Sequence, residues 1–469
     1  MAGSRGGLAG ASRYGMSVVN ASIGAKVSGW QEADVRFKVG RDALGEAVAF
    51  VARALPSRPV IPVLSAILLD AGPDGLILSC FDYEVSARVQ VDADIIEPGT
   101  ALVPGRLLAE ITRSLPARPA EFSEDAGLVN LTCGSAQFEL VCLPVQDYPP
   151  LPESPDPVGT VDSGTLLAAV AQVAPAASRD DTLPMLTAVC LDISGPVMTL
   201  VATDRYRLAA REVSFTPAAR DLRAIALVPA RIMVEASRTM AAGLPVAVAF
   251  RADGDRPAEG LVSLEAGGRR LTARLIAGEF IRYQARFPAD FGCCAELPAG
   301  PLIEAVRRAA LVAERAGPVR LSFTPGKVVI EAHAEGRARA AETVGVDFTG
   351  EQTVISFNPH FLLDGLTAAE GLARSPEVVA AAAAASDEAA AAVAAIGAEA
   401  GGGREAGEAA RAQEDAAIGR IRLEFTSPAK PALITWVGDE GLAADEDGGE
   451  SRGPAFRYLL VPLRAPVRT

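Results

Sequence analysis

The chain has 469 residues, 49% of them hydrophobic, and a formal net charge of −14. This length and apolar content are enough for several cores, or about three domains of about 150 residues each. The acidic balance argues against a protein that holds nucleic acid through a broad basic surface. Charged residues, Gly or Pro interrupt every apolar run before it reaches about 18 residues, so the sequence predicts no transmembrane helix.

Six cysteines and two histidines offer little to metal or nucleophile chemistry. No two cysteines have the CxxC spacing, and neither His333 nor His360 has a second histidine nearby. Zinc sites and disulfide frameworks depend on such spacings. We therefore expect no metal site and no cofactor.

Residues 1–34 are rich in Gly, Ser and Ala and contain no continuous apolar run. We expect them to form a disordered N-terminal extension. A first unit then spans residues 36–152, with a helical segment at residues 44–52 and a second helix that opens at Pro104. Proline suits the opening turn of a helix, because its missing N–H would have no partner there. Alternating apolar and polar residues around the helices predict antiparallel strands.

The same landmarks return in a second unit, which spans residues 160–287. The segment PVLSAILLD at residues 62–70 matches PMLTAVCLD at 184–192, and LILSCFD at 76–82 matches MTLVATD at 198–204. Both pairs are 122 positions apart, so the register does not slip between them. A repeat of this kind indicates duplication of a whole folding unit.

A third unit, residues 293–464, repeats the first helix at residues 302–310 and the second at Pro359. Residues 372–420 interrupt it with a segment dominated by Ala, Gly and Glu, which predicts a disordered insertion because it has no large apolar side chains to build a core. Residues 438–453 form an acidic loop before the last strand. The predicted fold class is α+β, with three tandem units of two helices packed on antiparallel sheet.

The stretch VATDRYRLAA, residues 201–210, gathers one Asp, two Arg and one Tyr between apolar residues. General acid–base catalysis uses clusters of this kind, and Asp204 is the best candidate for it. Unit one has Asp82 at the matching position but no counterpart of Arg207. We therefore interpret Asp204 as a hydrogen-bond acceptor in a turn or at a strand end, and an enzyme that uses Asp204 is the less favoured alternative.

Three tandem copies of this unit resemble the bacterial DNA polymerase sliding clamp, the β subunit of the replicative polymerase. The segments SRPVIPVLSAILL, SRDDTLPMLTAV, VATDRYRLA, FNPHFLLDGL and YLLVPLR carry the resemblance in the family's order and spacing. It implies a head-to-tail homodimer that closes a ring, with helices inward around double-stranded DNA and sheets outward. Such a clamp is a non-catalytic processivity factor. It would be cytoplasmic and nucleoid-associated, with no membrane contact.

The ring also accounts for the negative charge. A ring holds DNA by enclosure, so an acidic outer surface is compatible with a locally basic pore. Contacts to phosphates that slide along the duplex need not read its sequence. Arg58 matches a family residue that touches DNA, and the repeat supplies two further pairs of arginines, each seven residues apart on the second helix of a unit: Arg106, Arg113, Arg231 and Arg238.

Two alternatives remain open for these surfaces. The helix arginines could be ordinary solvated side chains, since unit three breaks the pattern with Phe361 and Ala368. The resemblance also implies a dimer interface, formed by an edge strand of unit one and a segment of unit three. Its residues could instead be core, Leu311 especially; they are Phe138, Leu140, Leu311 and Val312.

The family further implies an apolar pocket that captures short peptides from the replicative polymerase α subunit, the clamp loader, and repair and translesion proteins. Arg205 and Tyr206 stand where the family usually has Gly-His, and Ile281 stands where it usually has Pro. A divergent paralogue that sequesters clamp partners, or protects against a clamp-directed inhibitor, is therefore the alternative function. The matching pocket residues are Leu186, Thr203, Arg207, Leu208, Ile281, Leu459, Val461, Pro462, Leu463 and Arg464.

Overall fold

The computed structural model describes most of the repeated units and leaves out the predicted disordered segments. The described residues are 35–240, 243–251, 257–288, 290–314, 317–334, 336–372, 419–438 and 455–463. Residues 1–34, nearly all of the Ala/Gly/Glu-rich insertion and of the acidic loop, and Arg464 lie outside these ranges.

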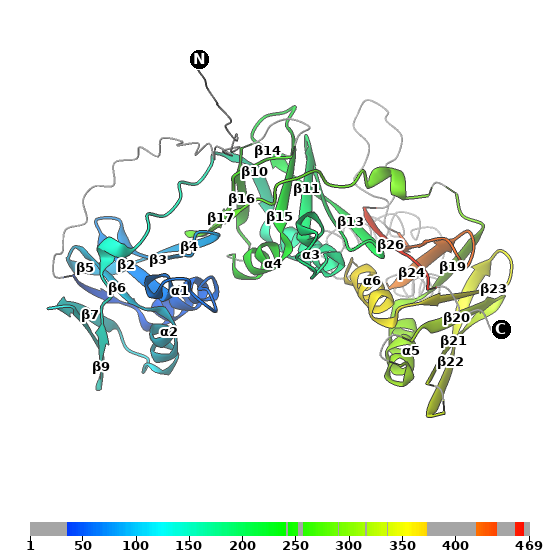
Figure 1. Ribbon diagram of the computed structural model, residues 1–469, viewed down its shortest axis with the longest axis horizontal. Helices are drawn as coiled ribbons and strands as arrows, with labels where there is room; N and C mark the ends of the chain where they lie inside the picture. Colours follow the sequence, from blue (N-terminus) through cyan, green and yellow to red (C-terminus); the bar gives the residue numbers. More distant parts are fainter. Residues whose placement is uncertain are drawn as a thin grey trace, which may run out of the picture.

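The three units follow one another along an arc, and their helices gather on its concave side (Figure 1). Antiparallel sheets form the convex side. Among the described residues, no helix is both long and apolar enough to cross a bilayer.

Unit one begins with β1 (Arg36–Val39) and α1 (Arg41–Arg53) and brings its second helix, α2 (Gly105–Ser114), beside α1. Pro104 precedes α2 as its N-cap residue, one position outside the predicted start. Gly105 is required there, because a Cβ atom would lie 2.6 Å from Leu55 Cδ1. The other strands are β2 (Ala66–Gly72), β3 (Gly75–Phe81), β4 (Val85–Val91), β5 (Ala93–Glu97), β6 (Gly99–Pro104), β7 (Ala120–Asp125), β8 (Leu128–Cys133) and β9 (Ala136–Val141).

Unit two repeats this order, with α3 (Ser163–Val173) and α4 (Ala230–Thr239) as its two helices. The Asp162 side chain caps α3 by accepting a hydrogen bond from the Thr165 backbone N–H. Its strands are β10 (Pro157–Asp162), β11 (Ala188–Ser194), β12 (Val197–Thr203), β13 (Arg207–Ser214), β14 (Thr216–Pro217), β15 (Arg223–Pro229), β16 (Pro245–Phe250), β17 (Leu261–Ala266) and β18 (Arg269–Arg274).

Unit three contains α5 (Ala299–Val312) and α6 (Pro359–Leu372), and α6 also packs on α3 of unit two. Its strands are β19 (Cys293–Pro298), β20 (Val319–Thr324), β21 (Gly326–Ala334), β22 (Ala338–Thr349), β23 (Thr353–Phe357), β24 (Arg420–Phe425), β25 (Ala432–Trp436) and β26 (Phe456–Leu460).

Two of the sheets run from one unit into the next. Strand β18 of unit two pairs with β4 of unit one, which creates a nine-stranded sheet of order β14-β10-β16-β17-β18-β4-β3-β2-β6. Strand β26 of unit three pairs in the same way with β13 of unit two, within a twelve-stranded sheet. A five-stranded sheet of order β5-β1-β7-β8-β9 completes unit one. Neighbouring units are therefore joined by main-chain hydrogen bonds as well as by side-chain packing.

Candidate functional site

The polar stretch singled out in the sequence forms the turn between β12 and β13. Asp204 Oδ1 accepts hydrogen bonds from the backbone N–H groups of Tyr206 and Arg207, both at 3.0 Å. In unit one, Asp82 Oδ1 accepts from the N–H groups of Glu84 and Val85 at 3.0 and 2.7 Å. The repeated aspartate thus has the repeated structural role that the sequence comparison predicted.

Arg205 occupies a left-handed backbone conformation in this turn, with φ at +80°, and Tyr83 does so in the matching turn at +72°. Glycine is the residue that adopts this conformation without strain. The glycine that the resemblance implies at position 205 would therefore suit this turn better than Arg205 does. Arg205 is exposed, and its backbone N–H donates to the Thr203 hydroxyl at 3.3 Å.

Arg207 is buried, with 8% of its surface exposed, and its guanidinium bonds to two units of the chain. Within unit two, Nε donates to Asp204 Oδ2 at 2.9 Å, and Nη2 donates to the carbonyl of Pro175. Towards unit three, Nη1 donates to Asp364 Oδ2 at 2.5 Å and to the Tyr458 hydroxyl at 3.4 Å. A buried charge needs this many partners to offset its lost hydration.

The two aromatic partners of Arg207 come from unit three. The Phe361 ring lies under the guanidinium, 4.3 Å from its carbon to the ring centroid. Burial raises the pKa of the Tyr458 phenol, which donates its proton to the Phe361 carbonyl at 2.8 Å. The resemblance implies a place for Arg207 in a peptide pocket. The structure gives its guanidinium a set of partners within the chain, and no pattern in the sequence indicated them.

Several of the predicted pocket residues come together on the outer side of the β13–β26 pairing. Leu208 and Leu459 belong to one buried apolar cluster with Val201 and Leu433, and Ile281 packs against it. The Thr203 hydroxyl donates to the Arg207 carbonyl, the Val461 N–H to the Tyr206 carbonyl, and the Leu463 N–H to the Ser356 carbonyl. Leu186 and Pro462 are buried, whereas Val461 is exposed at the rim. Arg464 lies outside the described residues.

Tyr206 is the exposed aromatic side chain of this rim, with 54% of its surface exposed. Its ring stacks on Phe361 with centroids 6.3 Å apart. The rim is thus continuous with the Arg207 network beneath it, because both use Phe361.

The predicted DNA-facing arginines lie on exposed faces of α2 and α4. Arg106 and Arg113 are exposed on α2, opposite the buried Leu108 and Ile111. Arg106 Nη2 donates to the Pro56 carbonyl at 3.0 Å, which ties it to the loop that carries Arg58.

Arg231 and Arg238 are exposed on α4 and line a cavity of about 1000 Å³ between α3 and α4. Two further arginines, Arg179 and Arg274, line the same cavity and were missed in the sequence. The repeat could have identified Arg179, because it follows serine in SRDD of unit two as Arg58 follows serine in SRPV of unit one.

Unit three lacks the arginine pair for a packing reason. Phe361 lies beneath Arg207, and Ala368 is buried. This face of α6 packs against unit two, where its Asp364 pairs with Arg207, so an exposed arginine pair has no place on it. The interruption of the repeat follows from the junction between units.

The residues predicted at the dimer interface divide into two kinds. Strand β9 is an edge strand, in which Phe138 is half-buried and Leu140 is 1% exposed within the core of its own unit. Leu311, at the end of α5, is 83% exposed, and Val312 is half-buried. The alternative that Leu311 is core is therefore wrong, whereas the core alternative describes Leu140 within a single chain.

No group of three His, Cys, Asp or Glu side chains in the described part of the chain lies close enough to hold a metal ion. The Asp204 carboxylate is occupied by two backbone N–H groups and by Arg207. Its geometry is that of a structural acceptor, which leaves the enzyme alternative without support at this residue.

Comparison with known proteins gives a consistent result along the chain. The family models for the DNA polymerase III beta subunit match as N-terminal domain over residues 35–152, central domain over 160–281 and C-terminal domain over 284–373. The chain is 46% identical to the beta sliding clamp of Streptomyces coelicolor over 430 residues, covering 92% of this chain and 99% of that protein.

A second relative is the beta sliding clamp homolog GriR of Streptomyces muensis, 41% identical over 333 residues, which cover 71% of this chain and 88% of the relative. The crystal structure of the DNA polymerase sliding clamp from Bacillus subtilis superimposes with a TM-score of 0.74 at 22% identity. That match covers 92% of this chain and all of the Bacillus chain, and it shows that the fold is shared.

Proposed function

The chain belongs to the DNA polymerase III beta subunit family, the beta sliding clamps, and from this we infer that it is a sliding clamp of DNA replication. It would encircle duplex DNA and tether the replicative polymerase for processive synthesis. Clamps of this family are processivity factors and catalyse no step themselves, so the chain is not an enzyme. The domain limits that we propose are residues 36–152, 160–287 and 293–464.

The proposed DNA surface is the helical, concave side of the arc. Its support is the cavity between α3 and α4, where four arginines outnumber three carboxylates: Arg179, Arg231, Arg238 and Arg274 against Glu84, Asp181 and Asp364. Arg58, Arg106 and Arg113 would extend this surface across unit one. Concentrating positive charge on one side lets an acidic protein approach phosphates without a basic overall composition.

The proposed ring consists of two copies that meet head to tail. Edge strand β9 of one copy would extend its backbone ladder towards unit three of the other. The exposed Leu311, with Val312 and Phe138, would supply the apolar contacts, and Leu140 would support β9 from within. The protein would then act on DNA in the cytoplasm, at the nucleoid.

The proposed partner pocket lies at the outer side of the junction between units two and three. Leu208, Leu459 and Ile281 would receive the apolar anchors of a short peptide, and Tyr206 and Val461 would border it. The predicted occupants are peptides of the polymerase α subunit, the clamp loader, and repair and translesion proteins. Removing residues from Pro462 onward should abolish peptide binding in a fluorescence-polarisation titration while DNA encirclement persists.

Primer extension on a long singly primed circle, with the cognate polymerase and clamp loader, tests the clamp function. Addition of the protein should lengthen the DNA products that the polymerase makes each time it binds the template. The double variant Arg231→Ala, Arg238→Ala should weaken retention on nicked circular DNA about tenfold at moderate salt. Arg223→Ala, an exposed arginine on strand β15, is the matched control and should leave retention unchanged. Sedimentation as a monomer at micromolar concentration would contradict the ring.

A second candidate is a clamp paralogue that sequesters partners or protects against a clamp-directed inhibitor. The similarity to a relative named as a clamp homolog favours it, as do Arg205, Tyr206 and Ile281 at positions where the family usually has other residues. A chain that dimerises and binds partner peptides but gives no processive synthesis would support this candidate over the first.

A further inference from the structure

The two junctions between units have matching positions on the outer face of the sheet. At the junction of units one and two, Arg270 of β18 pairs in register with Arg88 of β4. At the junction of units two and three, Arg457 of β26 pairs with Ala210 of β13. Because Arg88 and Ala210 are 122 positions apart in the repeat, Arg270 and Arg457 occupy equivalent places.

At the second junction, the chain itself occupies the groove over these positions. The Tyr283 hydroxyl donates to Asp192 Oδ2 at 2.8 Å, and Gln284 Nε2 donates to the same oxygen at 3.2 Å. The Phe287 ring lies 4.7 Å from the guanidinium of Arg457. The connecting segment thus supplies two donors and one aromatic ring to the sheet beneath it.

At the first junction, the corresponding segment lacks those groups. Counted from Tyr148 and Phe280, which end the matching segments QDY and GEF, Leu151 stands in place of Tyr283 and Pro152 in place of Gln284. Neither side chain can donate a hydrogen bond. Pro155 replaces Phe287 by the same count.

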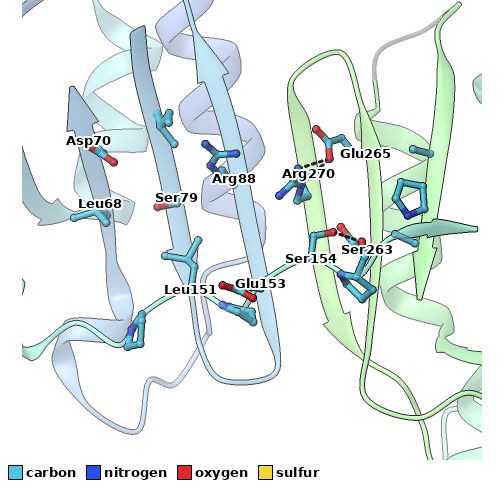
Figure 2. Close-up of a pocket in the computed structure, with 17 residues that line it drawn as sticks. Leu68, Asp70, Ser79, Arg88, Leu151, Glu153, Ser154, Ser263, Glu265 and Arg270 are labelled. Atoms are coloured by element: carbon cyan, nitrogen blue, oxygen red, sulfur yellow. Dashed lines mark hydrogen bonds and ion pairs between the residues drawn. The ribbon is translucent and has the colours of Figure 1, made fainter. Parts of the chain in front are cut away.

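A cavity of about 630 Å³ remains where those groups are missing (Figure 2). Leu151, Glu153 and Ser154 of the connecting segment cross it, and the strands of both units form its floor. The cavity over the second junction is smaller, about 410 Å³, and Tyr283 and Gln284 line it.

Two charged side chains in the first cavity, Asp70 and Arg88, make no side-chain hydrogen bond or close ion pair among the described residues, although each feels the other's charge. Asp70, the counterpart of Asp192, accepts no hydrogen bond there, and its half-buried position raises the pKa of its carboxyl while the charge of Arg88 lowers it. The Arg88 guanidinium makes no ion pair or hydrogen bond within that part of the chain. Arg270, directly opposite, is neutralised by Glu265, with Nε 2.7 Å from the carboxylate.

Like charges placed opposite each other in a sheet are unfavourable. Glu265 neutralises the guanidinium of Arg270, and the guanidinium of Arg88 is left to bind another anion. The cavity therefore offers Asp70 no hydrogen-bond donor and offers Arg88 no carboxylate within ion-pair distance, although Glu153 also lines it. Its remaining lining includes the apolar side chains Leu68 and Ile77 together with Leu151.

We propose that this cavity is a second docking site, which takes a short extended peptide of a partner protein carrying a tyrosine and a carboxylate. The tyrosine hydroxyl would donate to Asp70, as Tyr283 does to Asp192 in the neighbouring junction. The carboxylate would accept from Arg88, which has the planar donor set that suits it. This site is separate from the pocket proposed between units two and three.

An extended peptide fits the geometry of the floor. Asp70 and Arg88 lie on β2 and β4, with β3 between them, so about 10 Å of sheet separates the two strands. Side chains two positions apart in an extended peptide point to the same face and would reach both groups. The required pattern is a tyrosine and a glutamate separated by one residue, among small apolar neighbours.

An array of acetylated, amidated peptides of about nine residues, about 30 Å long when extended, provides the probes. Each peptide contains Tyr-x-Glu, with the other positions drawn from Leu, Pro, Ala and Ser. Full-length chain is applied to the array, and the tightest peptides are measured by fluorescence polarisation. The same peptides with Phe for Tyr, or Gln for Glu, are the ligand controls.

Arg88→Ala is the decisive protein variant, because the repeat already has alanine at the equivalent Ala210 and the fold accepts it. It should weaken binding about tenfold or more. Replacing Tyr by Phe in the peptide should weaken its binding to the wild-type protein. The same replacement should have a smaller effect on binding to the Asp70→Asn variant. Arg223 lines the cavity of the second junction, so Arg223→Ala should leave the affinity for the peptide unchanged.

Three outcomes would overturn the proposal. They are an array without any Arg88-dependent peptide, binding that Arg223→Ala weakens as much as Arg88→Ala, and displacement of the bound peptide by duplex DNA. Loss of binding on truncation from Pro462 would place the peptide in the other pocket and would equally contradict a second site. Thermal melting of each variant separates these outcomes from unfolding.

Discussion

The two junctions between units share their strand pairing but differ in the side chains that support it. Between units two and three, the buried Arg207 bonds to Asp364 and Tyr458 across the junction. Between units one and two, Val85 stands at the matching position, and the ion pairs across the junction lie at the surface. The first junction therefore combines main-chain pairing with surface ion pairs, and a buried arginine network is added where the partner pocket is proposed.

Replacing Arg207 gives the largest expected effect on this comparison. Arg207→Met keeps the length of the side chain but leaves the carboxylates of Asp204 and Asp364 without their cation. The loss in stability should be about 3 kcal/mol, measured by urea unfolding. Arg274→Met, which removes the exposed pair with Glu84 at the other junction, should cost less than about 1 kcal/mol. Equal losses would show that the buried network adds nothing to the junction.

Adding one methyl group at the second junction should have the next largest effect. In Gly365→Ala the new Cβ would lie 2.5 Å from the ring of Tyr458, so the ring that contacts Arg207 must move. We expect a loss of about 2 kcal/mol in thermal unfolding. Gly45→Ala in α1 is the matched control, because no atom lies within 4 Å of its Cβ position. It should stabilise the protein by about 0.5 to 1 kcal/mol, since alanine favours a helix interior.

Replacing Asp192 and Asp70 by asparagine should change the stability of the protein in opposite directions. Asp192→Asn weakens the acceptor for Tyr283 and Gln284 and should destabilise the protein by about 1 kcal/mol. Asp70→Asn removes a half-buried carboxylate that has no such donor and should raise the melting temperature at neutral pH. A rise for Asp192→Asn, or a fall for Asp70→Asn, would contradict the difference between the junctions.

The pH dependence of the Asp70 effect follows from the direction of its shift. Because burial raises the folded-state pKa, the native protein binds this proton more tightly than the unfolded chain does. The ionised carboxylate is therefore a cost above the folded-state pKa, and the cost disappears as the pH falls towards the ordinary value of 3.8. Melting curves of wild type and Asp70→Asn should converge over that range.

The smallest effect is expected in the turns, where the two junctions are alike. In Arg205→Gly, the strain of the left-handed backbone conformation is relieved, which should stabilise the protein by about 1 kcal/mol. Glycine also raises the conformational entropy of the unfolded chain, which opposes this gain. The net change should stay below about 1 kcal/mol, and Tyr83→Gly should give a similar value. Calorimetry that finds a large change for only one of them would show that the two turns are not equivalent.

Local features of this fold could be predicted because the chain repeats itself. The match between Asp82 and Asp204 was enough to assign a turn acceptor, and the seven-residue spacing of the helix arginines placed them on one exposed face. These inferences needed only the register of a repeat and the period of a helix.

Features that depend on distant partners could not be predicted. Nothing near Arg207 in the sequence indicates Asp364, which is 157 positions away, or the carbonyl of Pro175. The local pattern around Leu311 allowed both an interface position and a core position, and the fold places it at the exposed end of α5. Alternation along β9 likewise could not tell that Leu140 faces the core of its own unit. In each case, tertiary packing decides the environment of a residue whose local pattern is ordinary.

The strand pairing between units has a consequence for dividing this protein into fragments. A piece that ends after β18 but lacks unit one would expose a row of unpaired backbone groups along β18, and one that lacks unit three would expose β13. Such edges attract other strands, including those of a second copy. A protease nick between units should therefore leave the pieces associated, and separately expressed halves should find each other and reassemble.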